Sequence, residues 1–357
     1  MSEKMRAVRL YAPGDVRCVE VDIPAIEKVN DVIVKVKSCG VCGSDIPKVM
    51  VKGAYHYPIT IGHEFAGKVI SVGSDVKSLL PGDRITVMPL LNCGKCDYCK
   101  IGQAVMCDDY DYYGSRTDGA MAEYVRVRAE NCLLLPPKVD YEMGSMTDPA
   151  SVALHAIRKA GIEPGQKAAI YGLGAIGYLA VQWLKAIGCK TVLVVDLFDD
   201  KLKLAETLGA DYCINAKEQD AVKKILEFTD GKGADVVIEL AGSKITQVQA
   251  IQSARKGGKV VFCGISYDDL TIPNSALQNI LRGELQLIGS WNSSIAPLPI
   301  NEWQSALDFM QKGLIDTKSL VTHRYKLEDC QKAFDMMYKR MEVFTKVLFK
   351  PEEMQKQ

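Results

Sequence analysis

The sequence predicts an α/β protein with two domains, the first mostly β and the second a doubly wound parallel sheet. The chain has 357 residues, and single hydrophobic cores tend to stop growing near ~250–300 residues. Strand patterns and turns dominate from Met5 to about Ala129, whereas strands and helices alternate after Pro164-Gly165. Such alternation is typical of a parallel sheet with helices on both faces.

The composition excludes several classes of partner. Hydrophobic residues make up 48% of the chain, and 44 basic residues balance 44 acidic ones without any block of one sign. A balanced charge favours neither nucleic acid nor an anionic membrane as a partner. No apolar run approaches the ~20 residues that span a bilayer, and the first ten residues lack the apolar core of a signal peptide. We therefore expect a cytoplasmic protein.

The first domain, predicted over residues 1–150, is assembled from short strands. Asp31–Lys37 and Phe65–Gly73 have the composition of partly buried strands, and Pro81-Gly82-Asp83 forms a turn before a third strand at Arg84–Val87. A long helical pattern is first found near Ser145–Ala160.

The second domain, predicted over residues 151–290, contains six strands separated by helices. The expected strands are 167–171, 191–195, Asp211–Ile214, Val236–Leu240, Val260–Cys263 and Leu285–Ile288, and the expected helices include Lys201–Leu208, Ala221–Phe228 and Thr246–Ala254. Ligands bind such sheets at the carboxyl ends of the strands.

The remaining segment, residues 291–357, is predicted to return to the first domain. It contains two helical patterns, Glu302–Lys312 and Leu327–Lys339, and a final strand at Thr345–Phe349. The cleft between two such domains is the expected place for chemistry.

A glycine turn at the start of the second domain predicts a dinucleotide site. In the G-x-G-x-x-G pattern the glycines permit a tight turn, the approach of a pyrophosphate, and close helix packing. The helix that follows offers unpaired N–H groups to phosphate. An acid about 20 residues further on can accept from the adenosine ribose. The candidate residues are Gly172, Gly174, Ala175, Ile176, Gly177 and Asp196; an ordinary structural turn is the alternative.

Four of the 12 cysteines form the most specific local pattern. Cys93, Cys96, Cys99 and Cys107 follow one another at short spacing, and four thiolates can close a tetrahedral shell around zinc. A closed shell leaves no position for substrate, so the role of this ion would be structural. Unpaired thiols in a loop and an iron–sulfur cluster are the alternatives.

A second set of candidate ligands is dispersed. Cys42 lies in Gly-Val-Cys-Gly-Ser-Asp, and His63 and Glu64 are adjacent. Cysteine, histidine and carboxylate with one open position form a catalytic zinc arrangement; a buried cysteine and a core histidine are the alternative. The neighbouring dinucleotide motif favours zinc, because zinc polarises an alcohol oxygen and lowers the pKa of the alcohol.

Together these motifs resemble those of the zinc-dependent medium-chain alcohol and polyol dehydrogenases, over essentially the whole chain. Within the family, the stretches 57–65, 114–119 and 282–291 are most similar to enzymes of sugar-alcohol phosphates. The resemblance implies a GroES-like first domain, a Rossmann second domain, two zinc ions per chain, NAD, and a homodimer or homotetramer. It implies oxidation of a secondary alcohol of a hexitol phosphate to a keto-sugar phosphate by hydride transfer.

The resemblance also assigns roles at the zinc sites. Cys42, His63 and Glu64 would hold the catalytic zinc, and the four clustered cysteines the structural zinc. Ser44 would pass the alcohol proton towards solvent, or else serve only as a turn residue; the histidine that some relatives keep three residues later is Pro47 here. Relatives of this type usually have glutamate where this chain has Asp148, which would reach zinc either directly or through water.

The nicotinamide cofactor is predicted to be NAD. Leu197-Phe198-Asp199-Asp200 follows Asp196 without an arginine, so a 2′-phosphate would meet negative charge there. The ends of later strands, including Gly264 and Ser290, are expected near the nicotinamide, as in the family.

Substrate choice is the least determined part of the prediction. A phosphorylated polyol needs cations, and the candidates are Lys48, Lys52 and Arg116. An unphosphorylated polyol, butanediol or threonine would use the same metal chemistry. A catalytically silent zinc and dinucleotide-binding protein is the alternative of another class, although the intact set of Cys42, Ser44, His63 and Glu64 speaks against it.

Overall fold

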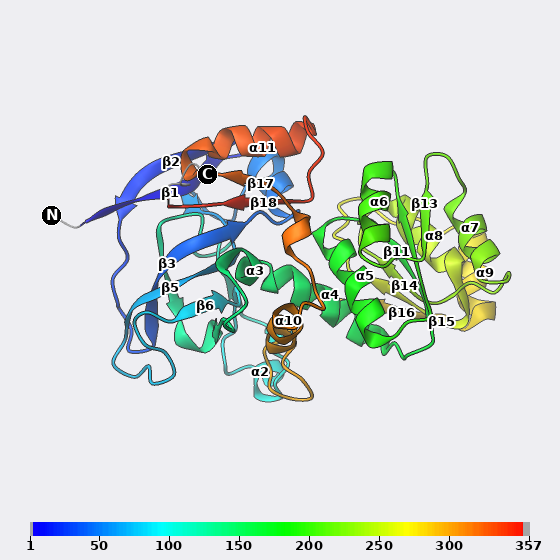
Figure 1. The fold of residues 1–357 in the computed structure, drawn as a ribbon, viewed down its shortest axis with the longest axis horizontal. Coiled ribbons are helices and arrows are strands. Elements are labelled where there is room, and N and C mark those ends of the chain that lie inside the picture. Colours follow the sequence, from blue (N-terminus) through cyan, green and yellow to red (C-terminus); the bar gives the residue numbers. More distant parts are fainter. Residues whose placement is uncertain (1–2, 353–357) are drawn as a thin grey trace. The chain divides into compact units, whose positions relative to one another are not determined.

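The structure, a computed structural model, describes residues 3–352 and divides into two compact units (Figure 1). Unit 1 holds the chain up to Asp148, the segment Ser294–Gly313, and the chain from Thr317 onwards. Unit 2 holds Pro149–Ser293 and Leu314–Asp316. The first and last parts of the sequence therefore fold together.

The main sheet of unit 1 is organised around β3 (Asp31–Gly40), which is almost wholly buried. The strand order is β10-β6-β5-β3-β18-β17, and β9 also pairs with β3. The bounds are Glu64–Val72 for β5, Arg84–Val87 for β6, Tyr124–Arg128 for β9, Cys132–Leu134 for β10, Val321–Tyr325 for β17 and Lys346–Phe349 for β18. Because β18 pairs antiparallel with β3, the last described strand lies beside one of the first.

Smaller elements surround this sheet. A second sheet contains β1 (Lys4–Ala12), β2 (Asp15–Asp22) and β4 (Ile59–Thr60), and β7 (Leu90–Leu91) pairs with β8 (Asp111–Tyr112). The helices of unit 1 are α1 (Asp45–Pro47), with a π-helical turn at Lys48–Lys52 after it, α2 (Asp97–Lys100), α3 (Tyr141–Ser145), α10 (Glu302–Gln311) and α11 (Cys330–Lys339). Val32, Val34 and Phe65 belong to its core, which also takes in Phe334 of α11 and Phe349 of β18.

Unit 2 is a six-stranded parallel sheet in the order β13-β12-β11-β14-β15-β16. The strands are β11 (Lys167–Tyr171), β12 (Thr191–Asp196), β13 (Tyr212–Asn215), β14 (Ala234–Glu239), β15 (Ala254–Phe262) and β16 (Gln286–Gly289). The helices are α4 (Thr147–Ala160), which begins at the end of unit 1, α5 (Ala175–Ile187), α6 (Asp199–Thr207), α7 (Ala221–Phe228), α8 (Lys244–Ser253) and α9 (Asn274–Gly283). The strand order reverses direction at β11, which is where a doubly wound sheet binds its ligand.

The predicted fold class is confirmed, although several individual elements, among them β1, β2, α9 and β17, are not among the predicted segments. All six strands of the parallel sheet are present, and α7 has the predicted bounds. Neither α9 nor β17 is among the segments predicted from the sequence. In α9 only Ala276 and Gly283 are buried, and no residue of β17 is fully buried, so neither segment adds a long buried apolar run to the core.

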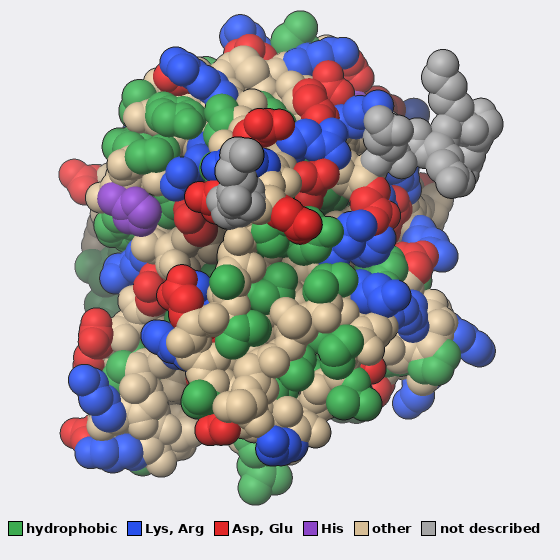
Figure 2. Space-filling model, turned by 90° about the vertical axis from the view of Figure 1, so that its left-hand side faces the viewer, with side chains coloured by type: hydrophobic (Ala, Val, Ile, Leu, Met, Phe, Trp, Pro, Cys, Tyr) green, Lys and Arg blue, Asp and Glu red, His purple; other side chains and the backbone are tan. Residues whose placement is uncertain are grey.

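Charge is dispersed over the face of the molecule that Figure 2 shows. On the face drawn in Figure 2, basic and acidic side chains are interspersed rather than gathered into blocks of one sign. Among the described residues, no helix combines the length and the apolar character required to cross a membrane.

Candidate active site

Cys42, His63 and Glu64 come together in unit 1, with one potential ligand atom from each lying within 4.8 Å of the others. Cys42 follows the end of β3, and His63 and Glu64 stand at the start of β5, the strand that pairs with β3. The antiparallel register places Gly40 opposite Glu64. The sheet therefore brings the dispersed motif of the sequence into a single group.

Asp45 contacts two members of this group, Cys42 and His63. Its carboxylate is fully buried, accepts from the Cys42 backbone N–H at 3.2 Å and lies 3.5 Å from Nδ1 of His63. Burial alone would raise the pKa of Asp45, but Lys48, 2.9 Å away, and His63 outweigh it and hold the pKa below its ordinary value. An ionised carboxylate beside Nδ1 favours this orientation of the imidazole electrostatically, while Nδ1 itself has no hydrogen-bond partner among the described residues.

The carboxylate of Glu64 has a buried cationic partner. Nζ of Lys346, in β18, bonds Oε2 of Glu64 and donates to the Val41 carbonyl at 3.1 Å. Both side chains are almost fully buried, with exposures of 3% and 2%. The contact joins residues 282 positions apart.

Two more side chains lie around the group. Asp148 is buried, its Oδ1 has no hydrogen-bond partner among the described residues, and burial raises its pKa to about 7. It is not one of the residues whose ligand atoms converge within 4.8 Å. The Tyr112 ring meets His63 edge-on at 5.5 Å, and burial raises the pKa of its hydroxyl. Ser44 Oγ donates to Cys42 Sγ at 3.2 Å.

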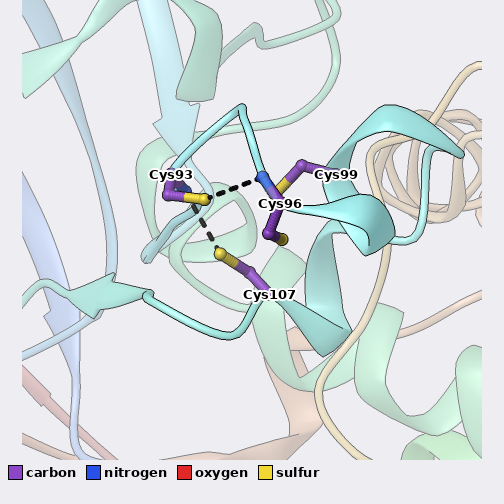
Figure 3. Close-up of side chains that lie close together, drawn as sticks. All are labelled: Cys93, Cys96, Cys99 and Cys107. Atoms are coloured by element: carbon purple, nitrogen blue, oxygen red, sulfur yellow. Dashed lines mark hydrogen bonds between the residues drawn. The ribbon is translucent and has the colours of Figure 1, made fainter.

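The four clustered cysteines converge as the sequence predicts (Figure 3). All four thiols are free, and one sulfur from each lies within 4.8 Å of the rest. Backbone and side-chain N–H groups already point at the sulfurs: Cys93 N–H at Cys107, Cys96 N–H at Cys93, and Asn92 Nδ2 at Cys99. Backbone N–H groups of Lys95 and Cys96 lower the pKa of Cys93 to about 6, which favours the thiolate that a metal requires.

The glycine turn of unit 2 has the geometry that its pattern predicts. Gly172 has φ +101°, and a Cβ there would lie 2.8 Å from the Ala241 nitrogen. A Cβ on Gly177 would lie 2.2 Å from the Gly172 oxygen, whereas one on Gly174 would meet nothing within 4 Å. The first and third glycines therefore permit close packing, and the second leaves open space before α5, which begins at Ala175 and continues through Ile176.

Asp196 closes this turn from the adjacent strand. Its carboxylate accepts from Leu173 N–H at 2.8 Å and from Leu197 N–H at 2.7 Å, and Lys201 Nζ lies 3.9 Å away. Gly264 and Ser290 follow the ends of β15 and β16, and the buried Ser290 hydroxyl has no hydrogen-bond partner among residues 3–352.

The three candidate phosphate-binding cations differ in their surroundings. Lys48 is half-buried and donates to Asp45 and to the Gly114 carbonyl. Lys52 is exposed at the end of the π-helical turn. Arg116 is exposed, and its guanidinium is held between the rings of Tyr55 and Tyr110, 4.7 and 4.4 Å from their centroids.

Comparison with known proteins identifies the family. The model of the alcohol dehydrogenase GroES-like domain matches residues 28–137, and the model of the zinc-binding dehydrogenase matches residues 175–312. Galactitol 1-phosphate 5-dehydrogenase of Escherichia coli K12 is 36% identical over 329 residues, covering 92% of this chain and 95% of the relative. The chain belongs to the zinc-type alcohol and polyol dehydrogenase family. Sorbitol dehydrogenase of Bacillus subtilis 168 is 32% identical over 341 residues, covering 93% of each chain.

Solved structures agree with this membership. The crystal structure of galactitol-1-phosphate dehydrogenase from E. coli matches with a TM-score of 0.92 and 36% identity, over 97% of this chain and all of the other. A zinc-binding dehydrogenase structure from Sinorhizobium meliloti 1021 bound to NADP matches with a TM-score of 0.90 and 32% identity, over 98% of this chain and 100% of that one. Both domains of the family are therefore present, a GroES-like domain and a Rossmann-like domain.

Sequence reasoning missed two residues of the candidate site. Asp45 stands within the motif that contains Cys42, but a lone acid in a turn gives no sign of its contact with His63. Lys346 belongs to a strand whose other residues are buried and apolar. A lysine in such a strand is itself a signal, because a buried ammonium requires a partner.

Proposed function

We propose that the protein is a zinc- and NAD-dependent dehydrogenase that oxidises a secondary alcohol of a hexitol phosphate. The proposed reaction converts galactitol 1-phosphate to a keto-sugar phosphate such as tagatose 6-phosphate. The observation that carries the proposal is the convergence of Cys42, His63 and Glu64 in unit 1 of a chain whose unit 2 has a glycine turn suited to a dinucleotide.

The residues present fit a catalytic zinc ion. A thiol, an imidazole and a carboxylate converge, leaving a tetrahedral ion one position for substrate. Burial, followed by the charges of Glu64 and Asp45, raises the pKa of the Cys42 thiol to about 12, and a divalent cation reverses this because a coordinating thiol is deprotonated. When bound, zinc supplies Lewis acidity that lowers the pKa of an alcohol.

The surrounding side chains have separate tasks in this proposal. Asp45, 3.5 Å from Nδ1 of His63, would orient the imidazole so that Nε2 could bind the metal. Ser44, whose hydroxyl reaches Cys42 Sγ, takes the alcohol proton and passes it towards solvent. Asp148 is buried with an unpartnered oxygen, and we propose that it contacts the ion through water, or directly after a small backbone shift. The four cysteines hold a second, structural zinc, for which their closed arrangement leaves no open position.

NAD is the proposed cofactor. Gly174 leaves room for the pyrophosphate, and the N–H groups at Ala175 and Ile176 begin α5 beside it. Asp196 accepts from the adenosine ribose, and its negative charge disfavours the 2′-phosphate of NADP. Lys201, 3.9 Å from Asp196, is the nearby cation that could offset this charge, so the two cofactors should be compared directly.

We propose Arg116 as the principal contact of the substrate phosphate, with Lys52 of the same unit as a second candidate. Two tyrosine rings fix the Arg116 guanidinium, and no carboxylate pairs with it among the described residues. A preoriented guanidinium binds phosphate in a bidentate manner. Lys48 already neutralises Asp45, so its contribution to phosphate binding would be secondary.

Turnover of a substrate panel tests the function. The panel contains galactitol 1-phosphate, sorbitol, 2,3-butanediol and threonine, each with NAD and with NADP, and NADH formation is followed at 340 nm. We expect the highest kcat/KM for the phosphate ester with NAD. An equal kcat/KM for sorbitol would reject the phosphorylated substrate, and no turnover with any alcohol would reject the enzymatic proposal.

Oxidation of an unphosphorylated polyol is the second candidate function, because a sorbitol dehydrogenase matches over 93% of the chain.

Assembly into a homodimer or homotetramer is also proposed. The edge strand β16 pairs only with β15 within the described chain and exposes 41% of Leu287, and such an edge can pair with a second copy. Light scattering would report a monomer if this is wrong.

A further inference from the structure

The parallel sheet contains a buried carboxylate that the proposed chemistry does not use. Glu239 is the last residue of β14, and its side chain is fully buried. In the register of the sheet it stands between Tyr171, which precedes the glycine turn, and Phe262, which ends β15. It therefore lies at the carboxyl edge of the sheet, where doubly wound folds bind ligands.

One oxygen of Glu239 organises the turn that follows β14. Oε1 accepts three hydrogen bonds, from the N–H groups of Ala241 and Gly242, both at 2.9 Å, and from the Thr246 hydroxyl at 2.7 Å. Thr246 belongs to the first turn of α8. The carboxylate thus fixes the strand end, the turn and the helix start as one assembly.

The Glu239 backbone organises the next turn. Its carbonyl accepts from the N–H groups of Cys263 at 3.0 Å and Gly264 at 2.9 Å. The two turns touch, since a Cβ on Gly264 would lie 2.3 Å from the Gly242 nitrogen and 2.9 Å from Oε2 of Glu239. In the described part of the chain, Oε2 has no hydrogen-bond partner.

The assembly is also packed against the dinucleotide turn. A Cβ on Gly172 would come within 2.8 Å of the Ala241 nitrogen, so Ala241 limits the path of the first glycine. Asp196 and the glycine turn lie on the β11–β12 side of the switch point. A dinucleotide spans the switch point, so its other half must lie over β14 and β15, where Glu239 holds both turns.

We propose that Glu239 is the positioning residue for the nicotinamide half of the cofactor. It shapes the two turns that receive this half and leaves the adenosine half to Gly174 and Asp196. The inference rests on the proposed use of a nicotinamide cofactor, and it assigns to Glu239 a role in orientation rather than in contact with the reacting atoms.

The test compares two ligands that differ only in the nicotinamide. Calorimetry measures the Kd of NADH and of ADP-ribose for the zinc-loaded wild type and for Glu239→Ala. We expect the Kd of NADH to rise at least tenfold and the Kd of ADP-ribose to rise less than twofold. Glu239→Gln keeps an acceptor for the three donors, so NADH affinity should return to within threefold of the wild type.

Two controls keep the result interpretable. Asp235→Ala removes a carboxylate from the other end of β14, where it accepts from Lys167 N–H at 2.7 Å and from Arg255 at 2.6 Å. It should lower stability without changing the ratio of the two affinities. If Glu239→Ala does not fold, Thr246→Val replaces it, with an expected threefold change in the ratio and recovery in Thr246→Ser.

Equal losses of NADH and ADP-ribose affinity in Glu239→Ala, or no loss of either, would overturn the role of Glu239. A wild type that binds neither ligand would instead overturn the proposed use of a nicotinamide cofactor. The two failures are therefore distinguishable in the same titrations.

Discussion

Replacing Lys346 by methionine should destabilise the metal-free protein and raise its affinity for zinc. The Lys346 ammonium is buried against Glu64 and the Val41 carbonyl, and the two charged side chains have exposures of only 3% and 2%. Removing one partner of a buried ion pair costs about 3–5 kcal/mol, because the other charge is left uncompensated. Methionine retains most of the length and apolar volume of the lysine stem, so the loss is chiefly electrostatic.

Bound zinc should compensate for the stability that the metal-free Lys346→Met variant loses. Lys346 and a cation held by Cys42 and His63 compete for the same Glu64 carboxylate. Without the lysine, zinc would be the cation that pairs with the Glu64 carboxylate. If zinc binding restores about 3 kcal/mol of the lost stability, the affinity for zinc rises roughly 100-fold. Two assays measure the pair of effects: denaturant unfolding after chelation of the metal, and competition for zinc with a chromogenic chelator.

Lys350→Met is the matched control for Lys346→Met. Lys350 follows the same strand and donates to Glu142 at 3.2 Å, but its side chain is 24% exposed. A pair of this kind is worth about 0.2–1 kcal/mol, and zinc affinity should not change. The reasoning is refuted if the metal-free variant and the metal-free wild type have the same free energy of unfolding. It is also refuted if the variant binds zinc more weakly than the wild type.

Three further changes test other parts of the account. Asp196→Ala removes charged hydrogen bonds worth about 1.5–3 kcal/mol, so the Kd of NADH should rise roughly 10–100-fold while the zinc content stays constant; unchanged NADH affinity would remove Asp196 from the cofactor site. Arg116→Met should raise KM for the hexitol phosphate by a similar factor and leave sorbitol kinetics unaltered, and equal effects on both substrates would contradict a phosphate contact. Glu142→Gln tests the pH dependence of stability. The Arg324 guanidinium holds the pKa of Glu142 below its ordinary value, so the stabilisation is present above pH ~4.3 and is lost as the pH falls. The free energy of unfolding should therefore differ from that of the wild type by about 0.5–1 kcal/mol at pH 7. The two values should converge as the pH falls through the lowered pKa of Glu142, and a difference that persists in strong acid would refute this origin.

The sequence predicted those features that depend on short-range patterns. The glycine turn and the four clustered cysteines each lie within 15 residues or fewer, and their spacing alone restricts their geometry. The parallel sheet of unit 2 was equally visible, because fully buried strands form continuous apolar runs. The return of the C-terminal segment to the first domain was predicted as well, but the strand order and the pairing of β18 with β3 were not.

The other contacts of the candidate site and of the parallel sheet depend on strand register and on pairing between distant parts of the chain. Lys346 reaches Glu64 because β18 lies beside β3, and Glu239 binds the turns after two strands because their ends are level in the sheet. The lysine in the apolar strand β18 indicates that some partner is needed, but the sequence identifies neither Glu64 as that partner nor the turns that Glu239 binds. Asp45 was visible within a motif, but its contact with His63 required the pairing of β3 with β5.

The zinc content of Cys42→Ser, measured by mass spectrometry of the purified protein, tests the central claim most directly. The wild type and a Cys213→Ser control, which alters a thiol outside both groups, should each contain two zinc ions per chain. Cys42→Ser should contain one, held by the four clustered cysteines, and should be inactive. Two ions in Cys42→Ser, or fewer than two in the wild type, would contradict a catalytic zinc held by Cys42, His63 and Glu64.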